Sequence, residues 1–187
     1  VHLYRPFSNK YLNSVIPSSV KNIAVLDRAK DPAASGEPLY LDVVNALKNR
    51  DLNIIGGRYG LSSKNTTPAQ IKAVFDFINS NDSHHNFTIG INDDVTNLSL
   101  DLDDSFYIPN EMTEFLIYGY GSDGMVSTSK DIIKIIGDYT DNFVQGYFQY
   151  DSKKSGGVTR SHIRISDEQI RRPYYVDNPS LVVVSKE

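Results

Sequence analysis

Apolar residues alternate along the chain between short runs and helical spacing. In the first half, apolar runs at 23–26, 53–55 and 87–91 have the length and composition of buried strands. Between them, apolar residues recur every three or four positions over 39–47 and 71–78, as on one face of a helix. Strands that alternate with helices predict an α/β fold with a mostly parallel sheet covered on both faces.

Helix boundaries are also visible in the first half. Ser8 is placed to cap a short helix that ends at Pro17, and the Thr66-Thr67-Pro68 triplet is typical of a helix start. Lys48 and Arg50 follow the helix predicted at 39–47, where positive charges interact favourably with the C-terminal end of the helix dipole.

A second α/β unit follows an acidic stretch. Residues 101–111 are rich in Asp and Glu, contain one proline and interrupt the periodicity, so we place the domain boundary there, between domains at 1–105 and 112–187. Beyond it, strands are expected at 115–118, 143–150, 162–165 and 181–184. The isoleucines of 132–136 predict a helix that ends at Gly137.

Composition narrows the class of protein. With 40% apolar and 22% charged residues, the 187-residue chain is globular, and its apolar runs are too short for a membrane span. The net charge of −4 argues against a nucleic-acid-binding surface. The absence of cysteine excludes disulfides and cysteine-ligated zinc or iron–sulfur clusters within these residues. Because the chain starts without Met or a signal peptide, we expect a piece of a larger intracellular protein.

The most informative local motif is the glycine turn, residues 119–124, which fits Gly-x-Gly-x-x-Gly between a predicted strand and a predicted helix. Glycines let the backbone approach an anion closely, and the first N–H groups of a helix point towards it. A phosphate, pyrophosphate or phosphorylated coenzyme would suit such a turn. Asp138 and Asp141 lie where a ribose-binding acid would stand in a dinucleotide fold. The alternative is a strand–helix turn that binds nothing.

Other candidates are weaker on their own. Lys153 and Lys154, beside Gly156 and Gly157, follow a predicted strand and could contact phosphates, although surface lysines are common. Arg58, in a second glycine-rich strand exit, could bind a carboxylate or phosphate or clamp its own loop. The adjacent pair His84-His85 lacks a partner at metal-ligand spacing, so we predict no metal site there, and no complete catalytic set is present.

Several segments in order are far more specific than any one motif. The most distinctive are Gly121-Ser122-Asp123-Gly124 and the stretch 150–157, which contains Lys153-Lys154-Ser155-Gly156-Gly157. The others are residues 3–8, 24–28, 36–43, 56–61, 90–96, 133–138 and 145–148. Together they resemble pyruvate:ferredoxin (flavodoxin) oxidoreductases from Leu3 to about Tyr174.

The resemblance implies a domain assignment. Residues 1–105 would match the family's second domain, which is similar to a transketolase C-terminal domain. Residues 112–187 would match the start of its third, gamma-subunit-like domain. The fold expected is therefore two incomplete Rossmann-like or transketolase-C-terminal-like three-layer units with mostly parallel sheets.

In that family the third domain contributes to coenzyme A binding, through its glycine turn and a lysine. The resemblance places these contacts on Gly121, Ser122, Asp123, Gly124, Met125 and Lys153, with Lys153 preferred over Lys154. Met125 stands where the family has threonine, so one hydroxyl contact is lost. No catalytic or metal-binding residue is expected in this segment.

The resemblance also implies the activity of the whole enzyme, oxidative decarboxylation of pyruvate to acetyl-CoA on thiamine diphosphate with Mg. Electrons pass through [4Fe–4S] clusters to ferredoxin or flavodoxin. Expected partners are the remaining domains and a second copy in a homodimer, without nucleic acid or membrane. The expected location is the cytoplasm, or a hydrogenosome or similar organelle in a eukaryote. The segment alone should be inactive, because the thiamine diphosphate signature and the cluster cysteines are missing.

Two other hosts remain open at this point. The same module could belong to a fusion flavoprotein, namely pyruvate:NADP oxidoreductase or the flavoprotein subunit of sulfite reductase. It could also be a non-catalytic nucleotide-binding module.

Overall fold

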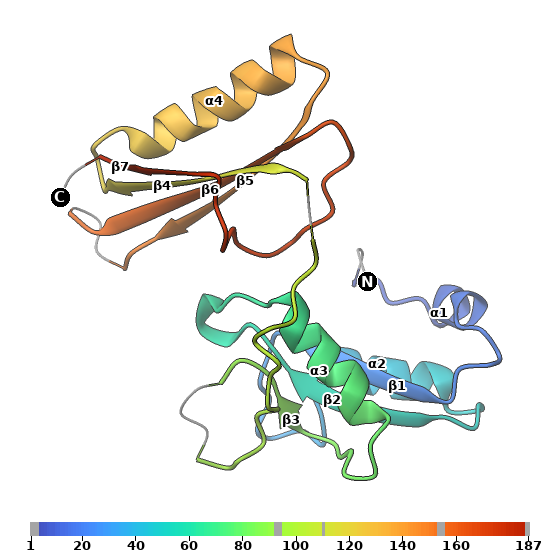
Figure 1. The fold of residues 1–187 in the computed structure, drawn as a ribbon. Coiled ribbons are helices and arrows are strands. Elements are labelled where there is room, and N and C mark those ends of the chain that lie inside the picture. Colours follow the sequence, from blue (N-terminus) through green and yellow to red (C-terminus); the bar gives the residue numbers. More distant parts are fainter. Residues whose placement is uncertain (1–3, 92–94, 110, 153–155, 186–187) are drawn as a thin grey trace. The chain divides into compact units, whose positions relative to one another are not determined.

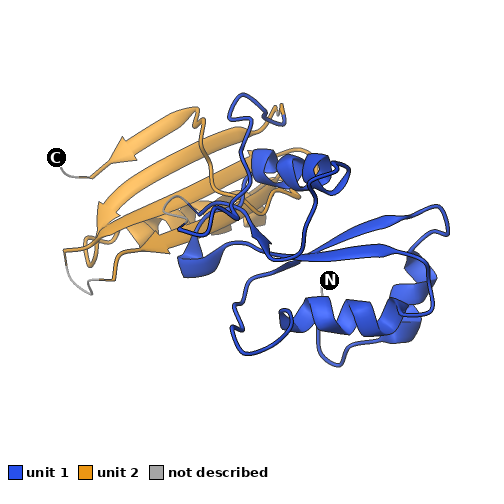
Figure 2. Cartoon of the chain, turned by 90° about the horizontal axis from the view of Figure 1, so that it is seen from below, with its two compact units in different colours: residues 1–108 blue, residues 109–187 orange. Residues whose placement is uncertain are grey.

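The computed structural model describes residues 4–91, 95–109, 111–152 and 156–185. The chain divides into two compact units, residues 1–108 and residues 109–187, which are coloured separately in Figure 2.

The first unit is built on a parallel sheet in the order β1-β2-β3. Its strands are β1 (Asn22–Asp27), β2 (Asn53–Arg58) and β3 (Phe87–Thr88). β3 is shorter than the predicted 87–91 run. Ile89 still donates its N–H to the Arg58 carbonyl, but Gly90 at φ +72° then turns the backbone out of the strand direction.

Helices cover both faces of this sheet (Figure 1). α2 (Pro38–Leu47) buries Val43 and Leu47 against Val25 on one face, where α1 (Asn9–Val15) also packs. α3 (Pro68–Ile78) packs on the other face, where the buried cluster consists of Ile55, Val74, Ile78, Phe87 and Ile89. The three-layer arrangement follows from alternation along β1 and β2, whose successive side chains point to opposite faces.

The helix caps in the first unit lie where the sequence predicts them. The Ser8 hydroxyl accepts from the Tyr11 N–H at the start of α1. Thr67 and Gln70 form a reciprocal capping box before α3, with Pro68 in the first turn. A short 3₁₀ helix, η1 (Leu61–Ser63), connects β2 to that start.

The second unit carries a mixed sheet in the order β5-β6-β4-β7. Its elements are β4 (Thr113–Tyr120), α4 (Met125–Tyr139), β5 (Phe143–Tyr150), β6 (Val158–Ser166) and β7 (Leu181–Val184). β6 is antiparallel to both β5 and β4, whereas β7 is parallel to β4.

The α/β prediction is confirmed, and the first sheet is parallel throughout. The expectation of a mostly parallel sheet is wrong for the second unit. Only seven residues, 151–157, separate β5 from β6, which is too short for the crossover that a parallel pair requires and enough for a hairpin.

The two faces of the second sheet are covered differently. α4 packs against β4, β5 and β6 on one face. On the other, Arg164 donates to the carbonyls of Arg172 and Tyr174, and the His162 ring lies 4.6 Å from the Tyr175 ring in a stacked arrangement. A non-helical segment around 172–176 therefore covers this second face.

α4 does not end at Gly137 as expected but continues to Tyr139. A glycine inside a helix costs only about 1 kcal/mol relative to alanine, which packing of the helix on the sheet can offset. Thr140 caps the end of the helix, and its N–H and hydroxyl both donate to the Ile136 carbonyl.

Candidate functional site

The glycine turn links the end of β4 directly to the start of α4. Gly124 caps the helix at φ +86°, in the left-handed region that favours glycine. Gly119 is required for packing, because a Cβ there would lie 2.7 Å from the Met125 Cβ and 2.8 Å from Asp123 Oδ2. Ser122 also has a positive φ of 76°. Backbone conformation and close packing therefore account for the tightness of this turn without any ligand.

Asp123 organises this turn. Its Oδ2 accepts from the Tyr120 N–H at 2.7 Å, and its Oδ1 accepts from the Met125 N–H at 2.9 Å. The hydroxyl of Ser185, just after β7, donates to Oδ2 at 2.8 Å. The Met125 and Tyr120 N–H groups, followed by the Ser185 hydroxyl, lower the pKa of this carboxyl below its ordinary value, so it is ionised at neutral pH.

Several donors at the start of α4 are not used by the protein itself. Among the described residues, the backbone N–H groups of Gly124, Val126 and Ser127 have no hydrogen-bond partner. The side chains of Ser122, Asp123 and Ser127 are exposed. The turn therefore offers an accessible set of donors beside one carboxylate.

Met125 occupies the first position of α4, and its Cβ would meet any side chain placed at Gly119. Its N–H is bound to Asp123, and its carbonyl accepts from the buried Ser129 hydroxyl. Within the described contacts Met125 supports the turn.

The turn and the β5–β6 hairpin loop lie at the same edge of the sheet. β5 and β6 are antiparallel, as are β6 and β4, so β4, β5 and β7 all end at this edge. Gly121 donates its N–H to the Gly157 carbonyl at 2.8 Å, which joins the turn to the end of the loop. Lys153 and Lys154 lie in this loop but outside the described residues.

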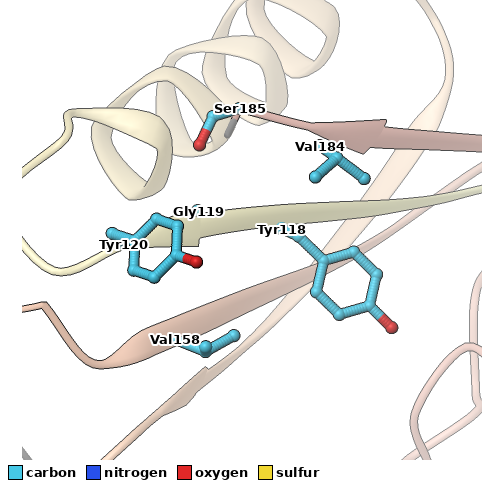
Figure 3. Close-up of a pocket in the computed structure, with 6 residues that line it drawn as sticks. All are labelled: Tyr118, Gly119, Tyr120, Val158, Val184 and Ser185. Carbon is cyan, nitrogen blue, oxygen red and sulfur yellow. The ribbon is translucent and has the colours of Figure 1, made fainter. Parts of the chain in front are cut away.

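A pocket of about 280 Å³ borders the turn (Figure 3). Its lining is mainly apolar and aromatic, and comprises Tyr118, Gly119, Tyr120, Val158, Val184 and Ser185. Tyr118 pairs with Val184 and Tyr120 pairs with Val158 in the sheet registers, so the pocket follows the ends of β4 and β7 and the start of β6.

Ser185 was not a sequence candidate. Its hydroxyl reaches Asp123 only because β7 lies parallel beside β4, a pairing between residues more than 60 positions apart. The signal that could have identified it is its position directly after a predicted strand.

The sequence interpretation of Asp138 and Asp141 is wrong. Both lie at or just beyond the C-terminal end of α4, while the glycine turn is at its N-terminal end. A helix of 15 residues is about 22 Å long at ~1.5 Å per residue, so these carboxylates lie far from the turn. Asp151, which directly follows β5, is at the correct edge.

In the first unit, Arg58 forms an ion pair within its own domain. Its Nε donates to Glu37 Oε1 at 2.5 Å, and the Glu37 side chain is buried. His85 accepts from the Gly56 N–H through Nδ1 at 2.9 Å and packs against the Tyr40 ring. These contacts explain both residues as structural.

Neither a metal-binding cluster nor a membrane-spanning helix is found among the described residues. Within residues 4–185, as far as they are described, no group of three His, Asp or Glu side chains is arranged to hold a metal ion. None of the described helices has the length and apolar character needed to cross a bilayer. With no cysteine in all 187 residues, the segment does not fit a cysteine-ligated iron–sulfur cluster.

Comparisons with known proteins identify the family. Residues 114–187 match the family model described as pyruvate ferredoxin/flavodoxin oxidoreductase. The chain is 51% identical over 188 residues to the pyruvate-flavodoxin oxidoreductase of Trichormus variabilis, covering 97% of this chain and 16% of that protein. It is 50% identical to the probable pyruvate-flavodoxin oxidoreductase of Escherichia coli and 49% identical to the pyruvate:ferredoxin oxidoreductase of Moorella thermoacetica, with the same coverages.

The chain thus spans about 16% of the length of the curated relatives it matches. Half of its positions are identical to theirs along nearly its whole length, and that agreement includes both units. The chain is therefore a segment belonging to the pyruvate ferredoxin/flavodoxin oxidoreductase family.

Proposed function

We propose that this segment supplies part of the coenzyme A site of an enzyme that oxidises pyruvate to acetyl-CoA and passes the electrons to ferredoxin or flavodoxin. The contacts are assigned to Gly121, Ser122, Asp123, Gly124, Met125 and Lys153. The names of the relatives support the reaction, since they are pyruvate-flavodoxin or pyruvate:ferredoxin oxidoreductases.

The observation that carries the site is the Gly121–Gly157 hydrogen bond. It joins the glycine turn to the loop that contains Lys153, at the edge where β4, β5 and β7 end. Open α/β sheets bind ligands outside the carboxyl ends of their strands. The free N–H groups of Gly124, Val126 and Ser127, among the described residues, provide donors for coenzyme oxygens.

The domain assignment is part of the proposal. Residues 1–105 correspond to the transketolase-C-terminal-like second domain and residues 112–187 to the start of the gamma-like third domain. Thiamine diphosphate, Mg and [4Fe–4S] clusters would be bound by other parts of the host, and the cysteine thiolates that hold such clusters are absent from this segment. A homodimer in the cytoplasm or an anaerobic organelle is the expected setting.

An activity assay tests the host reaction. The longer polypeptide that contains this segment should reduce ferredoxin or flavodoxin only when both pyruvate and coenzyme A are present, and should form acetyl-CoA. Electron transfer to NADP through a reductase domain would support the fusion flavoprotein instead. The 187-residue chain by itself should reduce no dye with pyruvate; measurable reduction would contradict the assignment.

A further inference from the structure

We propose that the pocket bordered by Tyr118 and Tyr120 binds the adenine ring of coenzyme A, and that Arg160 binds the 3′-phosphate of the same nucleotide. This inference rests on the proposed coenzyme site and goes beyond it. It names the part of the ligand that lies in the pocket and the residue that distinguishes coenzyme A from its dephosphorylated form.

Tyr118 and Tyr120 lie on the face of the second sheet opposite α4. A Cβ at Gly119 would meet the Met125 side chain, so Gly119 faces the start of that helix. Side chains alternate along a strand, and both tyrosines, the neighbours of Gly119 in β4, therefore point to the other face. Arg160 is directly opposite Tyr118 in β6 and shares that face. The three side chains thus lie together, away from the helix.

The end of this face next to the glycine turn is accessible. The segment 172–176 covers the other end, where it contacts His162 and Arg164. Val158 and Val184 border the pocket together with the two tyrosines (Figure 3) and are 40% and 59% exposed. A ligand can therefore reach the pocket from solvent.

The pocket has the size and lining for one flat ring system. Its volume of about 280 Å³ lies just below the range of about 300–1,000 Å³ that is typical of pockets for whole small-molecule ligands. Two tyrosine rings and two valines supply its apolar surface. Aromatic side chains stack on nucleobases through their π-faces, without base-specific hydrogen bonds. Coenzyme A carries one such ring, adenine, at the end opposite its thiol.

Arg160 places a positive charge beside this ring site. Its guanidinium carbon lies 5.7 Å from the centroid of the Tyr118 ring, and the side chain is exposed. No carboxylate among the described residues forms an ion pair with it. Guanidinium groups bind phosphates through paired N–H donors. A flat ring that carries a phosphate is therefore complementary to the tyrosines and Arg160 together.

The order of residues along the strands sets the orientation of the nucleotide. Tyr120 directly precedes the bend of the glycine turn, and the Tyr118–Arg160 pair lies two residues, about 7 Å, further from it. The 5′-pyrophosphate connects adenosine to the rest of the coenzyme, so it points towards the turn at the end of the strand. The 3′-phosphate is then the group that reaches Arg160.

Calorimetry with the full-length protein and two ligands tests the role of Arg160. Coenzyme A and dephospho-coenzyme A differ only in the 3′-phosphate. Arg160→Gln should therefore weaken coenzyme A about tenfold and leave dephospho-coenzyme A unchanged. The matched control is Arg171→Gln, an exposed arginine whose guanidinium bonds Gln169, and it should leave both affinities unchanged. Equal losses for both ligands in Arg160→Gln, or no loss for either, would overturn this assignment.

Two substitutions at Tyr120 test the ring site in the same protein. Tyr120→Phe keeps the aromatic surface and should retain wild-type affinity. Tyr120→Leu keeps an apolar side chain but loses the ring, so it should weaken coenzyme A and dephospho-coenzyme A about tenfold and leave pantetheine unchanged. If another part of the host packs on the pocket instead, Tyr120→Leu would lower the melting temperature and leave all three ligands unchanged, which would overturn the inference.

Competition on the wild-type protein needs no variant. Adenosine 3′,5′-bisphosphate, the nucleotide end of coenzyme A, should displace coenzyme A. Adenosine 2′,5′-bisphosphate, which carries the phosphate position found in NADP, should compete about tenfold more weakly, since its phosphate misses Arg160. Equal competition by the two nucleotides would contradict recognition of the 3′-phosphate.

Failure of the proposed function gives a different result. If the wild-type protein binds no coenzyme A, the coenzyme site itself is wrong. If it binds coenzyme A but the Arg160 and Tyr120 variants bind as the wild type does, only the placement of the nucleotide is wrong.

Discussion

Ser185 donates a hydrogen bond of 2.8 Å to Asp123, and this bond ties the end of β7 to the glycine turn after β4. The turn is therefore shaped by two strands that are distant in sequence. Its geometry therefore depends on the formation of the second sheet.

The Ser185–Asp123 bond should stabilise the turn. A hydrogen bond to a charged group is stronger than one between neutral groups, but solvent weakens its contribution at an exposed site such as this one. We expect Ser185→Ala to lower the free energy of unfolding slightly and to weaken coenzyme A binding a few-fold. Urea denaturation and calorimetry measure the two effects. The matched control is Ser14→Ala, on the exposed end of α1, which should leave binding unchanged.

Replacing either of two glycines in the second unit with alanine should change the stability of the protein, but in opposite directions. Gly119→Ala would place a Cβ 2.7 Å from that of Met125, so the turn must shift, and both stability and coenzyme A binding should fall. At Gly137 the nearest atom to an added Cβ is 3.9 Å away, and alanine is the better helix former by about 1 kcal/mol. Gly137→Ala should therefore raise the melting temperature. A stable Gly119→Ala protein with unchanged binding would contradict the packing argument.

A buried ion pair on the second sheet should be sensitive to the loss of one partner. Arg164 Nε donates to Glu114 Oε1 at 2.6 Å, and both side chains are about 95% or more buried. Removing one charge leaves the other unpaired in the interior, which typically costs about 3–5 kcal/mol. Glu114→Gln should lower the free energy of unfolding by that amount.

The control for that variant is an exposed pair of similar geometry. Lys72 and Asp76 are 2.5 Å apart on α3, with side chains 39% and 64% exposed, so Asp76→Asn should lower the free energy of unfolding far less than Glu114→Gln does. Equal losses in the two variants would show that burial of the Arg164–Glu114 pair is not what makes it important.

His162 should make stability depend on pH. Its Nδ1 accepts from the Val176 N–H and its Nε2 faces Gln149 Oε1, so the neutral ring with the proton on Nε2 fits. Burial lowers the pKa of His162 to about 4, from an ordinary value of 6.5. The unfolded chain therefore takes up a proton first as pH falls, and the stability present above pH 6.5 is lost progressively towards pH 4.

The shift in the pKa of His162 limits this loss of folding stability to about 3 kcal/mol. Urea denaturation between pH 7 and pH 4, compared with a His162→Gln variant, isolates this contribution from that of the carboxyl groups. Equal pH dependence in both proteins would show that His162 is not buried in its neutral form.

Local chemistry made parts of the fold predictable. Ser8 and Thr67 are caps whose partners lie three residues away, and the run 143–150 has the strand character that β5 shows. Gly137 misled the prediction of the end of α4, because helix propensity is weak beside the packing of that helix on three strands. The antiparallel pairing of β5 and β6 follows from the short loop at 151–157, and the apolar pattern of the two strands does not indicate their direction.

The site was only partly accessible from sequence. The glycine turn was found because its motif is local, and the Lys153 loop because it follows a strand. The turn's own anion was not anticipated, since nothing in the spacing shows that Asp123 folds back onto Tyr120 and Met125. Ser185 required the β4–β7 pairing, and Asp138 and Asp141 were misplaced because α4 carries them to the opposite end.

We propose above that the glycine turn and Lys153 form part of a coenzyme A site. Calorimetric titration of coenzyme A into the full-length protein, with Lys153→Ala and the exposed control Lys134→Ala, tests it most directly. We expect about a tenfold weaker affinity for Lys153→Ala, since a charge-assisted contact to phosphate is lost, and wild-type affinity for Lys134→Ala. Equal affinities for the wild type and both variants would show that Lys153 does not contact coenzyme A.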